Sequence, residues 1–148
     1  MNLKAEQLEL EQTRFSNPHG LQNAFNTSTA KDMLVLGMYA SEDKTFREIM
    51  NTDVHRCFSY SSDKKKKELK VWNNTNMLLK DGWEGMKTGQ TTAAGNCLAS
   101  VKNEVYIVVL NCPDSMSRFN ETKRLYEWYI NRKKVMNPTE STTSTDSF

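Results

Sequence analysis

Hydrophobic positions follow two different spacings along this chain. Over residues 1–50 they recur at helical intervals and predict three helices, at 1–11, from about Thr29 onward, and at 42–50. Thr29 and Asp32 stand in capping-box spacing before the apolar run 33–36. Ser41 is a candidate cap for the third helix. The stretch 13–28, rich in Asn, Pro and Gly, predicts an ordered loop.

From residue 54 the spacing becomes that of strands. Segments 54–60 and 68–72 predict a hairpin whose polar loop holds four consecutive lysines, and 83–89, 95–102 and 104–111 predict three more antiparallel strands. We expect the last two strands to be joined by a tight turn at Lys102 and Asn103. Every position from Val105 to Leu110 is apolar, which is typical of a strand covered on both faces.

A closing helix is predicted at about 114–133, with Asp114 as its cap. It would pack on the sheet through an apolar face made of Phe119, Leu125, Trp128 and Tyr129. Residues 137–148 have the composition of a disordered tail, so the predicted globular part is 1–136. Helices, then an antiparallel meander, then a helix indicate an α+β fold with three to five strands and flanking helices.

Composition excludes several classes of function. The net charge of +2 is too small to indicate binding to nucleic acid or to a membrane surface, and no apolar stretch reaches the length of a membrane helix. The first residues contain no apolar core of a secretory signal, and nothing indicates the compartment. We expect the lysine run 64–67 to be a solvated loop, with a targeting signal or binding patch as the alternative.

The three cysteines, Cys57, Cys97 and Cys112, form no CxxC pair, so the sequence predicts neither a zinc site nor a disulfide framework. We expect buried free thiols, no metal and no cofactor. Histidine chemistry is not indicated either. His19 lies in a loop that it would brace, and His55 with Cys57 lacks an orienting group.

The segment with the strongest chemical signal is 82–100, centred on Lys87-Thr88-Gly89 at the end of a predicted strand. A ligand that ends in a free carboxylate needs a fixed positive charge and a hydroxyl donor, which Lys87 and Thr88 supply. Gly89 has no side chain, so an extended ligand could approach the strand edge. An exposed strand end without function remains the alternative for the tripeptide alone.

The flanks of this tripeptide resemble those of a known family. Asp81-Gly82, Gly85, Thr91, Ala94-Gly95, Leu98 and Ala99-Ser100 stand as in the pattern around KTG of serine-type D-alanyl-D-alanine carboxypeptidases, and 13–21 and 28–33 resemble the family's NPHGL loop and the helix start after it. The resemblance covers about residues 1–133. It implies the C-terminal part of a β-lactamase/transpeptidase-like domain of the penicillin-binding kind, which would bind a peptidoglycan peptide or a β-lactam if its site were completed.

The resemblance also assigns roles within the site. Lys87 and Thr88 would bind the terminal carboxylate beside Gly89, and the backbone N–H of Gln90 would form half of an oxyanion hole. The family's Ser-x-x-Lys and Ser-x-Asn elements have no convincing match. Ser-x-x-Lys occurs by chance at Ser28, Ser41, Ser61 and Ser62, and Ser-x-Asn is absent. We therefore expect the chain alone to be inactive.

Three alternatives remain: an incomplete carboxypeptidase sequence, a non-catalytic binding or scaffold protein, and one half of a split enzyme. The resemblance implies that the strand at 105–110 lies inside the family's sheet, next to a strand absent here. We therefore expect this edge to bind a second copy or a partner chain.

Overall fold

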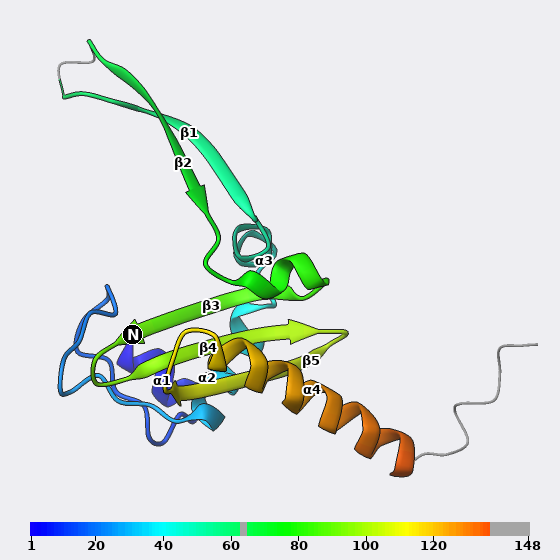
Figure 1. The fold of residues 1–148 in the computed structure, drawn as a ribbon. Helices are drawn as coiled ribbons and strands as arrows, with labels where there is room; N and C mark the ends of the chain where they lie inside the picture. Colours follow the sequence, from blue (N-terminus) through cyan, green and yellow to red (C-terminus); the bar gives the residue numbers. More distant parts are fainter. Residues whose placement is uncertain (63–64, 137–148) are drawn as a thin grey trace, which may run out of the picture.

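The computed structural model describes residues 1–62 and 65–136. Its main sheet is antiparallel with the strand order β3-β4-β5, and β1 and β2 form a separate two-stranded ribbon (Figure 1). The strands are β1 (Val54–Tyr60), β2 (Lys67–Asn73), β3 (Glu84–Thr91), β4 (Gly95–Lys102) and β5 (Val105–Cys112). The helices are α1 (Asn2–Gln7), α2 (Ala30–Ala40), α3 (Lys44–Met50), the 3-10 helix η1 (Met77–Asp81) and α4 (Ser117–Met136). The predicted α+β class is confirmed.

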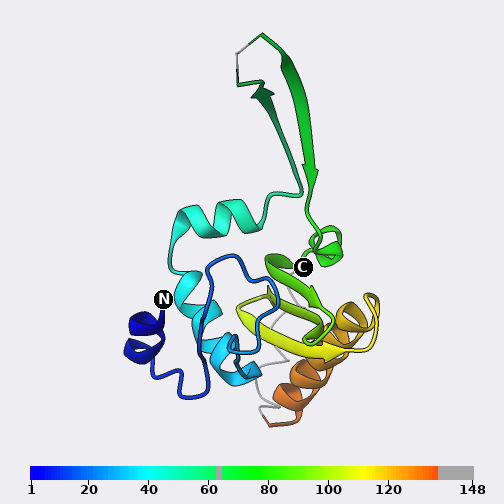
Figure 2. The same ribbon diagram turned by 90° about the vertical axis from the view of Figure 1, so that its left-hand side faces the viewer.

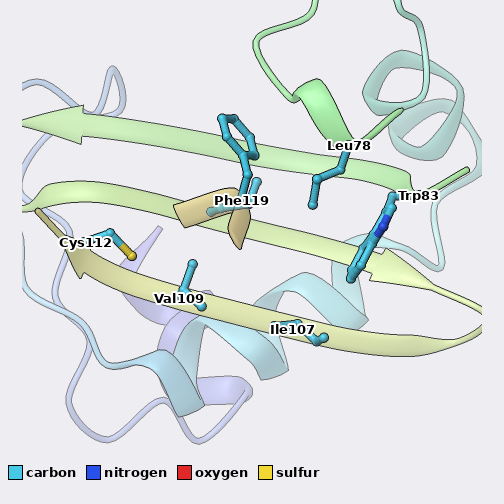
Figure 3. Packing of buried hydrophobic residues seen from close by; sticks show 7 residues of the cluster. Leu78, Trp83, Ile107, Val109, Cys112 and Phe119 are labelled. Carbon is cyan, nitrogen blue, oxygen red and sulfur yellow. The ribbon is translucent and has the colours of Figure 1, made fainter. Parts of the chain in front are cut away.

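The main sheet lies between two helical layers. Helix α4 packs on β4 and β5 from one side, and α2 packs on the same two strands from the other (Figures 1 and 2). The α4 side holds the core, built from Leu78, Trp83, Leu98, Ile107, Val109, Cys112 and Phe119 (Figure 3). Strand β5 is thus covered on both faces, as its uninterrupted apolar sequence predicts.

The N-terminal helices differ from the prediction at their ends. The first helix stops at Gln7 instead of continuing to residue 11, because Glu9 adopts a left-handed conformation with φ of 55°. Thr29 caps α2 as predicted, accepting the N–H of Asp32. The predicted cap of α3 is wrong, since Asp43 accepts the N–H of Phe46 and Ser41 instead ends α2.

The closing helix is also placed differently from its prediction. Asp114 does cap its start, since one carboxylate oxygen accepts the N–H groups of Met116 and Ser117, both at 2.8 Å. The expected packing face is wrong beyond Phe119, because the side chains of Leu125, Trp128 and Tyr129 are exposed. All buried residues of α4 lie in its first six positions, so the second half of the helix extends past the sheet (Figure 1).

Smaller corrections concern a turn and the thiols. The turn between β4 and β5 is at Asn103 and Glu104, one residue later than predicted, and both have the positive φ of a two-residue hairpin turn. All three cysteines are free, as expected, but only Cys112 is buried. The predicted tail, 137–148, lies outside the described residues. No helix within residues 1–62 and 65–136 is long and apolar enough to cross a membrane.

Candidate active site

The Lys87-Thr88-Gly89 segment lies on β3, at one edge of the main sheet. Among the described residues β3 pairs with β4 alone, so its other side is open to a ligand strand. Lys87 is opposite Ala99, Thr88 opposite Leu98 and Gly89 opposite Cys97. Because opposite residues share a face, Lys87 and Gly89 lie on the α2 side of the sheet and Thr88 on the α4 side.

Lys87 supplies an exposed positive charge. Its side chain is exposed, and its ammonium group donates to the carbonyl of the next residue, Thr88. An ammonium group has three donors, so this contact leaves two for an anion. Exposure and spare donors are the properties that a carboxylate-binding lysine requires.

The hydroxyl of Thr88 is held from the segment between β2 and η1. Thr88 is buried, and its oxygen is 2.5 Å from the hydroxyl oxygen of Thr75. The next residue, Asn76, is also buried, donates to Ser100 at 3.3 Å and accepts the N–H of Leu78 at 3.1 Å. Ser100 in turn donates to the carbonyl of Glu84 at 2.9 Å. This chain of hydrogen bonds fixes the Thr88 hydroxyl relative to its own strand.

Arg118 adds a second positive charge that the sequence analysis missed. The residue lies in the first turn of α4 and is only 7% exposed. One terminal nitrogen donates to the carbonyl of Gly89 at 3.3 Å and the other to Ser115 at 3.1 Å, while the buried Nε has no partner. No ion pair to Arg118 is found among the described residues. Since a buried cation is normally paired, the surroundings of Arg118 beside Gly89 are a candidate position for an anionic ligand group.

A signal for Arg118 does exist in the sequence. A helix stabilises negative charge at its N-terminus, and Asp114 marks where the closing helix starts. An arginine four residues after that cap opposes the helix dipole, so its position requires a separate reason. The contact with Gly89, 29 residues earlier, is a tertiary feature that no local pattern encodes.

An apolar cavity of about 480 Å³ opens on the α2 side of the segment. Lys87, Thr88 and Gly89 line it together with residues of α2 and α3, among them Met33, Phe46 and Met50. Its lining is suited to an apolar group or segment next to the Lys87 side chain.

None of the chance Ser-x-x-Lys matches forms a nucleophile beside this cavity. Ser28 shares a 2.8 Å hydrogen bond with Thr13, and Ser41 donates to the carbonyl of Gly37 at 2.8 Å. Ser61 and Ser62 directly follow β1, in the connection that leads to β2.

Both histidines make contacts within their own local segments. The Nδ1 atom of His19 accepts the N–H of Leu21 at 3.1 Å, in the loop-bracing role expected of it. His55 stacks on Trp72 in the ribbon, with ring centroids 6.0 Å apart. No cluster of three potential metal ligands is found in residues 1–62 and 65–136.

Comparison with known proteins agrees with the fold. The family model of D-alanyl-D-alanine carboxypeptidases matches residues 1–113. The chain is 29% identical over 133 residues to the D-alanyl-D-alanine carboxypeptidase DacA of Haemophilus influenzae, covering 86% of this chain and 32% of that protein. These matches show that the chain belongs to the D-alanyl-D-alanine carboxypeptidase family.

Solved structures extend the match to the fold. The DD-transpeptidase of Streptomyces K15 superposes with a TM-score of 0.78 at 27% identity, covering 86% of this chain and 51% of that one. Penicillin-binding protein D2 of Listeria monocytogenes, solved in a cefotaxime-bound form, gives 0.68 at 26% identity, covering 85% and 51%. The chain spans about a third of the length of DacA and about half of each solved chain.

Proposed function

We propose that this chain forms the carboxylate-binding part of a serine-type D-Ala-D-Ala carboxypeptidase site. The observation that carries the proposal is that three groups lie along the 87–89 segment at the open edge of β3: the exposed Lys87 ammonium, the Thr88 hydroxyl and the Arg118 guanidinium that donates to the Gly89 carbonyl. Two cations and a fixed hydroxyl suit a peptide that ends in a free carboxylate. The ligand would extend along the open edge of β3 past Gly89.

The proposed reaction removes the terminal D-alanine from peptidoglycan stem peptides. A serine attacks the carbonyl carbon of the D-Ala-D-Ala amide, forms an acyl-enzyme and releases D-alanine, and water then hydrolyses the ester. The N–H of Gln90 would stabilise the developing oxyanion, a contribution on the order of 100-fold in rate for each such donor. The nucleophile would come from a segment or chain that packs against the apolar cavity beside Lys87.

Binding of a D-Ala-D-Ala peptide to variants of Lys87 tests this assignment. Lys87→Ala should abolish binding, because the carboxylate loses its exposed charged partner. Lys80→Ala, which removes an exposed lysine from η1, is the matched control and should bind as the parent does. Equal binding by Lys87→Ala and the parent would show that Lys87 is not the anchor.

Reaction with a fluorescent β-lactam separates the catalytic alternatives. The chain alone should form no covalent adduct, since the described residues contain no activated serine. A labelled band that disappears on mutation of one serine would refute this. Labelling of a second chain only in the presence of this one would favour a split enzyme, and peptide binding without any labelling would favour a scaffold.

We also propose that the open edge of β5 binds another strand, from a second copy or from a partner chain. Strand β5 pairs with β4 alone among the described residues, and a groove of about 530 Å³ runs along it between α2 and α4. Leu34, Met38 and Trp128 line this groove. Unpaired backbone groups next to an apolar groove favour the addition of a strand.

A further inference from the structure

The β1–β2 ribbon exposes an apolar face. Its register places Phe58 opposite Leu69 and Arg56 opposite Val71, and side chains alternate along each strand, so these four share a face with Tyr60. The exposed fractions are 53% for Phe58, 59% for Tyr60, 52% for Leu69 and 43% for Val71.

No part of the main body covers this face, because the ribbon projects from the rest of the protein (Figures 1 and 2). Seven residues per strand give it a length of about 20 Å. An isolated two-stranded ribbon is marginally stable in water. Exposed apolar side chains on such a ribbon therefore indicate a surface on which it rests.

Positive charge is concentrated on the same ribbon. Its described residues, 54–62 and 65–73, carry five Lys and Arg against Glu68 alone, a net charge of +4. Asp63 and Lys64 cancel, so the rest of the chain has a net charge of −2, given +2 overall. The small total charge thus conceals a strong local asymmetry that the composition could not reveal.

The positive charges border the apolar face directly. The ammonium of Lys67 lies 3.8 Å from the centre of the Phe58 ring, and Arg56 stands on the same face. The ammonium of Lys70 is on the opposite face, where Glu68 pairs with it at 2.7 Å. The apolar face therefore carries Arg56 and Lys67, for which no ion pair is found among the described residues.

We propose that this face of the β1–β2 ribbon docks on an anionic lipid surface. Phe and Tyr side chains are suited to the boundary between headgroups and acyl chains, and Leu69 and Val71 would bury aliphatic surface there. Each nearby Lys or Arg gains from the negative surface potential. Docking uses both the charge and the apolar groups, and it is independent of the carboxypeptidase proposal.

The same features disfavour other occupants. A second ribbon would bring another net charge of +4 against the first. A nucleic acid would use the charge and the aromatic rings but would leave Leu69 and Val71 without a partner, since base stacking needs a flat aromatic face.

Flotation of the full chain with vesicles in a density gradient tests the proposal, because vesicle-bound protein rises whereas aggregates sink. The chain should float with phosphatidylcholine vesicles that contain about 30% phosphatidylglycerol, which is anionic, and it should not float with vesicles of pure phosphatidylcholine. The double variant Arg56→Ser and Lys67→Ser should bind on the order of 25-fold more weakly, from about fivefold per cation. The matched double variant Lys133→Ser and Lys134→Ser, at the end of α4, should bind within about twofold of the parent.

A second measurement, of tryptophan fluorescence, tests the proposal without relying on a variant that loses binding. In a chain whose two exposed tryptophans are replaced (Trp72→Phe and Trp128→Phe), leaving only the buried Trp83, Phe58→Trp keeps a large ring on the apolar face, and brominated acyl chains should quench its fluorescence. Leu125→Trp, on the exposed part of α4, is the control and should not be quenched. Equal quenching of both tryptophans, or equal flotation with neutral and anionic vesicles, would overturn the proposal. A DNA or RNA that binds at the same salt, with no flotation, would assign the face to nucleic acid instead.

Discussion

Two glycines on β3 allow packing and ligand approach to be separated. Gly85 and Gly89 stand four residues apart on the same strand, and neither has a positive φ. A Cβ atom at Gly85 would lie 2.1 Å from the carbonyl oxygen of Met50, which belongs to α3. A Cβ atom at Gly89 would meet only the Cβ of Cys97, at an ordinary 3.8 Å. Packing therefore requires glycine at 85 and permits a side chain at 89.

For Gly85→Ala the structure predicts a large loss of stability. The contact is with backbone, so α3 and β3 must separate, and the 2.7 Å hydrogen bond from the Gly85 N–H to Asn51 is strained or lost. Overpacking costs about 1–3 kcal/mol and the hydrogen bond about 1 kcal/mol, so the free energy of unfolding should fall by about 2–4 kcal/mol. In a chain of this size the melting temperature should fall by roughly 10 °C.

For Gly89→Ala we expect the free energy of unfolding to rise and peptide binding to weaken. Alanine loses less conformational entropy than glycine in a strand, so the free energy of unfolding should rise by about 0.5–1 kcal/mol. The new methyl group lies on the same face as Lys87, where the proposed ligand passes. Binding of a D-Ala-D-Ala peptide should weaken on the order of 10-fold, which corresponds to about 1.4 kcal/mol.

Thermal unfolding of both variants measures the change in stability, and calorimetric titration with the peptide measures the change in binding. Gly89→Val should bind still more weakly than Gly89→Ala while remaining folded, because its side chain extends further into the ligand path. Full peptide binding by Gly89→Val would show that no ligand runs along this edge. A Gly85→Ala variant as stable as the parent would show that α3 does not pack on β3 as described.

Other perturbations test the core, the charges and the open edge. Leu98→Ala should lower the free energy of unfolding, measured by urea denaturation, by about 2–5 kcal/mol, because Leu98 is only 1% exposed. A loss below about 1 kcal/mol would contradict its position in the core. The hydroxyl of Thr13 donates to Asp32 and lowers the pKa of that carboxyl below its ordinary 3.8, so stability should decline as pH falls through this region, and less steeply in Asp32→Asn. Light scattering at low micromolar concentration should show dimers or larger species that form through 105–110; a monodisperse monomer with a cooperative melt would refute that pairing.

Much of the fold could be predicted from local patterns. Alternating hydrophobic positions and turn residues predict the strands, and the capping residues Thr29 and Asp114 predict where the two long helices begin. The predictions failed where a tertiary contact decides. Nothing local shows that α4 extends past the sheet and leaves Trp128 exposed, or that 77–81 forms a 3-10 turn that places Leu78 in the core.

The candidate site divides in the same way. Lys87, Thr88 and Gly89 are adjacent in sequence, so a short motif reveals them together. Thr75 and Arg118 reach Thr88 and Gly89 from segments 13 and 29 residues away, through a hydroxyl contact and a carbonyl contact. Such positions depend on how η1 and α4 pack on the sheet, which hydrophobic spacing does not specify. The concentration of positive charge on the ribbon was not predicted for a similar reason, since it depends on which residues project from the main body of the protein.

The central claim is that the edge of β3 binds the free carboxylate of a D-Ala-D-Ala peptide. The most direct test is to titrate the chain with such a peptide and with its C-terminal amide, while following the backbone N–H resonances of Thr88, Gly89 and Gln90 by nuclear magnetic resonance. The acid should shift these three resonances in a saturable way, and the amide, which lacks the negative charge, should leave them in place. Equal shifts from both peptides, or shifts only at residues remote from β3, would contradict the account.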